Sequence, residues 1–179
     1  MTKVPGSPEP IEITAERTEY LQGNDVYEAD GSVVVVQGRR RLTADHMTLF
    51  MLSGTMVATG HVHLSDPLTE TFADRLELNV NTEMGVIVNG RLFVKESNTL
   101  VTGRLLQRFS ETHYRGKEGS FTNCDANEGQ VPAWRFTFKD LDLNLGERLF
   151  LNDTWFCIND HPILKLPTFA YPIQTSRKS

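Results

Sequence analysis

Apolar and polar side chains alternate at every second residue in four stretches of the chain. Each stretch surrounds a glycine, and the fourth is more polar than the other three. The residues that share one side are Tyr27, Ala29, Gly31, Val33 and Val35; Met56, Ala58, Gly60, Val62 and Leu64; Val86, Val88, Gly90, Leu92 and Val94; and Arg115, Lys117, Gly119 and Phe121. A period of two places such side chains on one face of a strand. The pattern therefore predicts strands with one apolar face and one largely wet face.

The central glycines recur at a constant spacing of 29, 30 and 29 residues. A second marker keeps the same period and precedes the glycines by 16, 16, 17 and 16 residues. This second marker consists of Ala15-Glu16, Ala44-Asp45, Ala73-Asp74 and Gly103-Arg104. Two markers with one period indicate internal repeats. Each repeat of about 29 residues is expected to be a pair of antiparallel strands.

A glycine that recurs inside a strand usually marks a bend, a bulge or a close approach of two backbones. Four such bends in register would fold a long meander over on itself. The sequence therefore predicts an all-β, antiparallel, jelly-roll-like or V-shaped sandwich of two sheets with a shared apolar interior. A fifth, degenerate unit is expected from Trp134 to Ile158, after a polar loop over 123–132.

The 179 residues suit one folded domain, which is expected over 11–170. Residues 1–10 contain three prolines and are expected to be a disordered arm or an artificial start, and 171–179 are expected to be a linker. No apolar run approaches the length of a membrane-spanning helix, so the chain is expected to be soluble. A net charge of −5 argues against nucleic-acid binding, which usually needs a basic surface.

His61 and His63 form the strongest enzyme-like pattern, because alternate residues of a strand share a face and two imidazoles can bind one metal ion, as in cupins. Glu70 comes late for such a motif, and His113 and His161 do not have its spacing. The simpler interpretation places both imidazoles on the solvent face. Because the chain also has no Gly-rich phosphate loop or nucleophile elbow, the sequence predicts no enzyme, no cofactor and no metal, with a cupin-like metalloenzyme as the alternative.

Three consecutive arginines, Arg39, Arg40 and Arg41, follow Gly38 at the expected end of a strand. The simple interpretation is a solvated turn whose charges keep a strand edge from aggregating. Contact with an anionic lipid is the alternative, since arginine pairs well with phosphate.

With this repeat of strand pairs, the chain resembles the OstA-like periplasmic domains of the lipopolysaccharide transport system, which LptA, LptC and LptD relatives share. The repeats cover 11 to about 122. The tail resembles the segment of LptD proteins that leads into their outer-membrane barrel, on four features. These are Cys124 in a Thr-x-Cys context, Trp134, the proline-containing HPILKLPTFAYPI, and Arg177-Lys178-Ser179. Cys157 has no counterpart in the family pattern.

The resemblance implies a non-enzymatic conduit for lipopolysaccharide transport and outer-membrane assembly, at the periplasmic face of the outer membrane. A stripe of aliphatic residues is ordinarily just a core, but related domains hold acyl chains between their two sheets. The resemblance thus predicts a lipid groove lined by Val33, Val35, Val62, Leu64, Leu92, Val94 and Phe121. A free-standing LptA-like bridge is the alternative within the family.

The resemblance also implies partners. An LptA-like bridge protein is expected to dock by strand addition on Ile11, Glu12, Ile13 and Thr14, and the plug lipoprotein LptE to bind through a barrel that follows the linker 171–179. Cys124 is expected to form a disulfide with a cysteine of that barrel, while an internal bridge between Cys124 and Cys157 is the competing interpretation.

Overall fold

The structure is a computed structural model that describes residues 9–124 and 130–173. These residues form twelve strands and no helix. The strands are β1 (Glu12–Thr14), β2 (Arg17–Leu21), β3 (Val26–Gln37), β4 (Arg40–Phe50), β5 (Thr55–Ser65), β6 (Thr69–Asn79), β7 (Gly85–Val94), β8 (Thr99–Arg108), β9 (His113–Thr122), β10 (Trp134–Asn144), β11 (Arg148–Ile158) and β12 (His161–Pro172). The all-β class and the fifth strand pair are confirmed.

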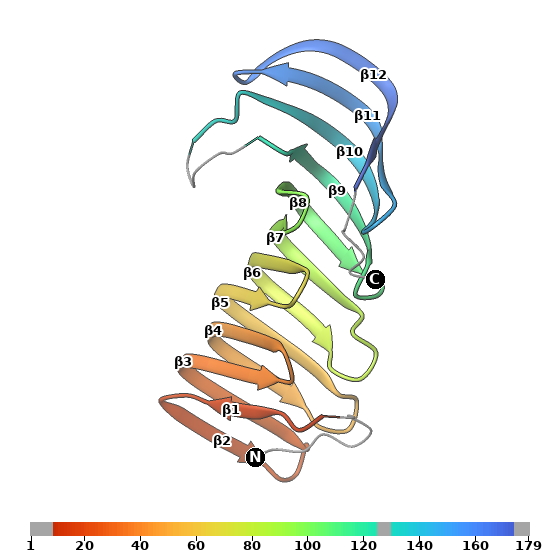
Figure 1. Ribbon diagram of the computed structural model, residues 1–179. Helices are drawn as coiled ribbons and strands as arrows, with labels where there is room; N and C mark the ends of the chain where they lie inside the picture. Colours follow the sequence, from red (N-terminus) through yellow and green to blue (C-terminus); the bar gives the residue numbers. More distant parts are fainter. Residues whose placement is uncertain (1–8, 125–129, 174–179) are drawn as a thin grey trace.

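All strands belong to one antiparallel sheet in which each strand from β3 to β12 pairs with its neighbours in the sequence. Strands β1 and β2 both pair with β3 and together form the first edge, while β12 forms the other edge. Figure 1 shows the strands stacked one after another, from the red β1 and β2 to the blue β12. The predicted two-layered, jelly-roll-like fold therefore arises from one sheet folded on itself.

The fold line is visible in the pairing, because every ladder from β3–β4 to β11–β12 is interrupted near the middle of its strands. Between β8 and β9, for example, Gly103 pairs with Gly119 and Leu105 with Lys117, and the residues between them are unpaired. This corner divides the sheet into two layers. The first layer holds the strand segments 17–21, 26–30, 46–50, 55–59, 75–79, 85–88, 105–108, 113–117, 140–144, 148–152 and 168–172, and the second layer holds 12–14, 33–37, 40–44, 62–65, 69–73, 90–94, 99–103, 119–122, 134–138, 154–158 and 161–166.

The corner explains both markers of the sequence repeat. In each repeat, the polar residue of the second marker bonds to a residue with left-handed φ beside the central glycine. The pairs are Glu16 with Ser32 (2.9 Å), Asp45 with His61 (2.8 Å), Asp74 with Asn89 (2.9 Å) and Arg104 with Glu118 (2.9 Å). The 29-residue period therefore corresponds to a polar side-chain interaction that is repeated in each repeat along the fold line.

The third and fourth stretches differ from the predicted pattern before their glycines. Ile87 is buried instead of Val86 and Val88, and Tyr114 is buried while Arg115 and Lys117 face solvent. The reason lies in the corner. In the first two repeats the central glycine and the residue after it both have positive φ, and the alternation of buried and exposed side chains continues through the corner. In the last two repeats only the residue before the glycine, Asn89 or Glu118, has positive φ, so the alternation shifts by one residue.

Strand β12 runs through a segment in which the sequence suggested no strand. Pro162 and Pro167 lack the N–H that a central strand needs, but an edge strand tolerates them. Pro167 lies at the corner opposite Asp153, where the ladder is interrupted, and Pro162 lies beside a bulge. The strand ends at Pro172, so 171 and 172 belong to the sheet, and Ile173 just after it is buried. The expected arm 1–8 and the tail 174–179 lie outside the described residues.

Candidate functional site

The space between the two layers is the candidate site, because the apolar side chains of every strand pair point into it. The seven predicted groove residues are 0–4% exposed and all come from the second layer. The facing first layer supplies partners that the sequence analysis did not assign to the groove. They include Met47, Leu49, Met56, Leu76, Leu78, Ile87 and Leu106. Of these, Met56 is on the apolar face that the alternation predicted, whereas Ile87 lies where the alternation shifts.

The apolar interior continues through the C-terminal strands. Phe136 of the second layer stacks on Phe169 of the first, with ring centroids 4.1 Å apart, and Phe121 lies 5.2 Å from Tyr171. The interior is therefore lined by apolar side chains from β1 to β12.

Among the described residues near β1, the interior is filled by its own side chains. At the end near β1, a small cavity of about 20 Å³ lies among residues such as Val35, Leu42, Met56 and Leu78. That is room for about one water molecule. This end of the interior therefore has no preformed space for an acyl chain.

Opposite the corner, the hairpin turns of the two layers form two rims. Backbone hydrogen bonds link neighbouring turns within a rim, as from Val80 N to Gly54 O (2.9 Å) and from Lys95 N to Leu68 O (3.1 Å). Within 9–124 and 130–173, none of the backbone hydrogen bonds between turns crosses from one rim to the other. Only side chains close this side of the fold.

Four charged residues join the rims along a line that we call the seam, defined by Arg40, Asp66, Glu83 and Arg108. Arg108 of the first layer donates to Asp66 of the second at 3.2 Å, and its Nη2 lies 3.8 Å from Glu83. Glu83 in turn pairs with Arg40 of the second layer. The Arg108 and Asp66 side chains are 3% and 1% exposed, whereas those of Arg40 and Glu83 are 24% and 28% exposed. The seam thus has a buried half and a half that water reaches.

Local contacts hold the seam residues in place. The Asp66 carboxylate accepts hydrogen bonds from the backbone N–H groups of Leu68 (2.9 Å) and Thr69 (2.8 Å), and Lys95 donates to its carbonyl at 2.7 Å. The seam is not visible in the sequence, because its members come from four separate turns and strand ends. The interpretation of the arginine run as a solvated turn is wrong for Arg40, since that side chain is partly buried against Glu83.

At the first edge, β1 pairs with β3 through Glu12–Val36, Ile13–Val35 and Thr14–Val34. Ile11, just before β1, is 1% exposed, and Ile13 is partly buried. The predicted docking segment is therefore an edge strand anchored to the core by its isoleucines.

The two cysteines are both free in the structure and lie in different surroundings. Cys124 is partly exposed just after β9, and its backbone N–H donates to the Thr122 hydroxyl at 3.1 Å. Cys157 is buried in β11. Residues 125–129 of the predicted polar loop lie outside the described part of the chain.

His61 and His63 are on the outer face of β5, and each contacts its own carboxylate. The His61 ring bonds to Asp45, and this hydrogen bond raises the pKa of the imidazole. The His63 ring lies 2.5 Å from Glu70 and stacks on Phe72. In the described part of the chain, no three His, Cys, Asp or Glu side chains are arranged to hold a metal ion.

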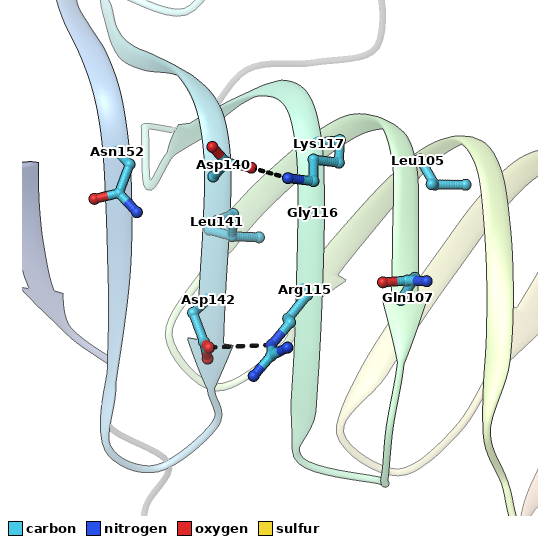
Figure 2. A pocket seen from close by; sticks show the side chains of 9 residues that line it. All are labelled: Leu105, Gln107, Arg115, Gly116, Lys117, Asp140, Leu141, Asp142 and Asn152. Carbon is cyan, nitrogen blue, oxygen red and sulfur yellow. Dashed lines mark hydrogen bonds and ion pairs between the residues drawn. The ribbon is translucent and has the colours of Figure 1, made fainter.

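A second hollow, of about 360 Å³, lies on the outer face of β8–β11. Figure 2 shows that its charged side chains point toward one another: Lys117 pairs with Asp140, and Arg115 lies 3.4 Å from Asp142. The opposite charges of this lining pair with one another, and such a polar surface offers little apolar contact to an acyl chain. Over the described residues, the chain also contains no helix that is long and apolar enough to cross a membrane.

Comparison with known proteins identifies the family. The family model described as LptA/(LptD N-terminal domain) LPS transport protein matches residues 12–114. LPS-assembly protein LptD of Vibrio cholerae is 28% identical over 173 residues, which cover 96% of this chain and 22% of the relative. The LptD of Photobacterium profundum is 30% identical over 178 residues, covering 94% and 21%. The chain thus spans about a fifth of the length of these relatives.

A solved structure supports the fold. The crystal structure of LptH from Pseudomonas aeruginosa, described as the LptA homologous periplasmic component of the lipopolysaccharide transport device, superimposes with a TM-score of 0.54 at 17% identity. The match covers 70% of this chain and 90% of LptH. The resemblance of the tail to LptD is also confirmed, because the LptD relatives align over nearly the whole chain. Since the family model matches more than half of its residues, the chain belongs to the LptA/LptD N-terminal domain family of LPS transport proteins.

Proposed function

We propose that this domain is a periplasmic conduit that carries lipopolysaccharide toward the outer membrane, with the acyl chains held between the two layers. The observation that carries the proposal is the apolar interior, which is lined by side chains of β1 and of all strands from β3 to β12. Membership of a transport family supports the same function.

The physical benefit of such an interior is large. Burying one CH₂ group contributes about 0.8 kcal/mol, so moving a chain of about a dozen carbons through water costs on the order of 10 kcal/mol. A continuous apolar interior removes most of that barrier. Because it binds acyl chains similarly along its length, it sets no direction, and the driving energy must come from outside this domain.

Photo-crosslinking tests the conduit. We expect a benzophenone side chain at Val62 or Leu92 to capture lipopolysaccharide, because both residues are buried between the layers. The same probe at Thr59 or His61, on the outer face of β5, should not capture it. Circular dichroism would show that all four variants are folded. Equal capture on both faces would contradict the proposal.

The partner edge is the second part of the proposal. We place an LptA-like bridge protein on β1, which has β3 on one side and no other strand among the described residues on the other. The opposite edge is less suited to strand addition, because β12 carries Pro162, Pro167 and Pro172, which cannot donate to a new ladder. Residues 12–21, the first edge, contain no proline.

Proline substitutions at the first edge test this docking. Successive N–H groups of a strand point to opposite sides, so of Ile13 and Thr14 one donates toward β3 and the other toward the free edge. We expect one of the variants Ile13→Pro and Thr14→Pro to abolish binding to the bridge protein with an unchanged Tm, and the other to lower Tm. Binding by pull-down and Tm by circular dichroism are the measurements. Binding retained by both variants would refute the edge assignment.

The remaining assignments complete the proposal. We place the domain at the periplasmic face of the outer membrane, with LptE as a partner through the barrel of the longer protein. Cys124 is the candidate for a disulfide to that barrel, and its partial exposure supports this role, whereas Cys157 is buried.

A further inference from the structure

Two arginines from opposite layers converge on one carboxylate in the seam. Glu83 lies in the turn before β7, and its Oε1 pairs with Arg40 of the second layer. Its Oε2 lies 3.8 Å from Nη2 of Arg108, which belongs to the first layer. That distance is longer than a hydrogen bond, so Glu83 attracts Arg108 without accepting from it. The chain thus holds one of its own anions between two guanidinium groups.

One edge of the Arg108 guanidinium group has no hydrogen bond. Its Nη1 donates to Asp66 at 3.2 Å. Its Nε and Nη2 have no hydrogen-bond partner among the described residues, although the side chain is only 3% exposed. These two atoms are the parallel donors with which arginine binds a carboxylate or a phosphate in a bidentate manner. Because unpaired buried donors cost free energy, an anion that offers two oxygens would be bound favourably here.

This edge lies at the boundary between the apolar interior and water. Leu106, which precedes Arg108 on the inner face of β8, is fully buried. Arg40 borders the small apolar cavity together with Leu42 and Leu78. The side chains of Arg40 and Glu83 are nevertheless 24% and 28% exposed. A lipid whose acyl chains lie in the interior would place a polar headgroup at such a boundary, because only its apolar part gains from leaving water.

We propose that Arg108 and Arg40 bind a phosphate group on the headgroup of the transported lipid, which displaces the Glu83 carboxylate; this inference rests on the conduit function proposed above. Of the four seam residues, two arginines and the carboxylate of Asp66 then face the ligand, so the site carries a net positive charge. A phosphate group has enough oxygens to accept from Nε and Nη2 of Arg108 and from Arg40 together. The displaced Glu83 side chain is at a position that water reaches, so its charge is hydrated.

A matched pair of short-chain lipids tests the site. Dioctanoyl phosphatidic acid and dioctanoylglycerol carry the same acyl chains, and only the first has a phosphate group. Isothermal titration calorimetry below the critical micelle concentration gives the Kd of each lipid. We expect the phosphatidic acid to bind at least about tenfold more tightly, because charge-assisted hydrogen bonds to both arginines add to the burial of the acyl chains.

Three variants identify the residues responsible. Arg40→Gln should reduce the preference for the phosphorylated lipid to about threefold or less. Arg108→Lys keeps a cation beside Asp66 but has no bidentate edge, so it should reduce the preference in the same way. Glu83→Gln removes the competing anion, and should tighten binding of the phosphatidic acid about fivefold while the Kd of dioctanoylglycerol stays the same.

The matched control is Lys117→Gln, which breaks an exposed ion pair on the outer face and should change neither Kd. Circular dichroism reports the folding and the Tm of every variant. Should Arg108→Lys fail to fold, the partly exposed Arg40 and Glu83 still decide the outcome. A seam with a purely structural role would change Tm in the three variants and leave the ratio of the two Kd values unaltered, which would overturn the proposal.

The outcomes separate this site from the conduit. If both lipids bind the unaltered chain with the same Kd, the interior holds acyl chains and the conduit stands, but the phosphate site is refuted. If neither lipid binds, the conduit and the phosphate site are both refuted. Glucosamine 1-phosphate, which has no acyl chain, distinguishes a lipid headgroup from free phosphate. Binding of this compound as tight as that of the phosphatidic acid would overturn the assignment to a lipid.

Discussion

Replacing Gly119 by alanine is expected to lower the free energy of unfolding by at least about 3 kcal/mol. A Cβ at this position would overlap the backbone carbonyl of Thr102 on β8, and would lie 2.7 Å from its carbon and 2.8 Å from Gly103 Cα. The obstacle is backbone of the neighbouring strand, so no rotamer change relieves it. Strands β8 and β9 would have to separate at the corner, where Gly103 pairs with Gly119.

Urea denaturation followed by far-UV circular dichroism measures this effect. The matched control is Gly23→Ala in the turn before β3, where nothing lies within 4 Å of the added Cβ. Its expected change is within about 0.5 kcal/mol. A loss below about 1 kcal/mol for Gly119→Ala would show that the corner adapts to a side chain, against the interpretation of close backbone contact.

Breaking the buried half of the seam is the second change with a large expected effect. Arg108→Leu should cost about 3 to 5 kcal/mol, because it leaves the Asp66 carboxylate buried without its cation. The double variant Asp66→Asn with Arg108→Leu should recover part of this loss. Asparagine keeps an oxygen acceptor for the N–H groups of Leu68 and Thr69 but carries no charge.

The control for this variant is Lys117→Leu, which breaks an ion pair on the outer face. The Lys117 side chain is 63% exposed, so its pair with Asp140 should contribute no more than about 1 kcal/mol. Denaturation midpoints of the four proteins give the comparison. A double variant that is less stable than Arg108→Leu would contradict the explanation by an unpaired buried charge.

The two predictions concern opposite sides of the folded sheet. At the corner, stability comes from backbone contact that leaves no room for a side chain. At the seam, it comes from a few charged side chains between two rims that, in the described part of the chain, are not joined by backbone hydrogen bonds.

The sequence by itself determined the repeat, the strand pairs and most of the interior. Alternation with period two is a local property, and burial of one face follows from it wherever the alternation is unbroken. Val33, Val62, Leu92 and Phe121 were identified in this way and are all buried. Their role as a lipid groove stays a prediction.

Tertiary structure decided the features that depend on how the sheet closes. The number of residues with positive φ at a bend, one or two, determines which side chains before the bend face the interior. This is why Ile87 is buried and Val86 is not. Pro162 and Pro167 are compatible with β12 because it is an edge strand whose corner needs no N–H at Pro167.

The seam lay beyond any local pattern. Arg40 and Glu83 are 43 residues apart, and Arg108 and Asp66 are 42 apart. No periodicity relates them, because they meet only when the folded sheet brings its two rims together. Most of the buried residues can therefore be predicted from the sequence, whereas the charged residues that join the two rims are brought together only by the folding of the sheet on itself.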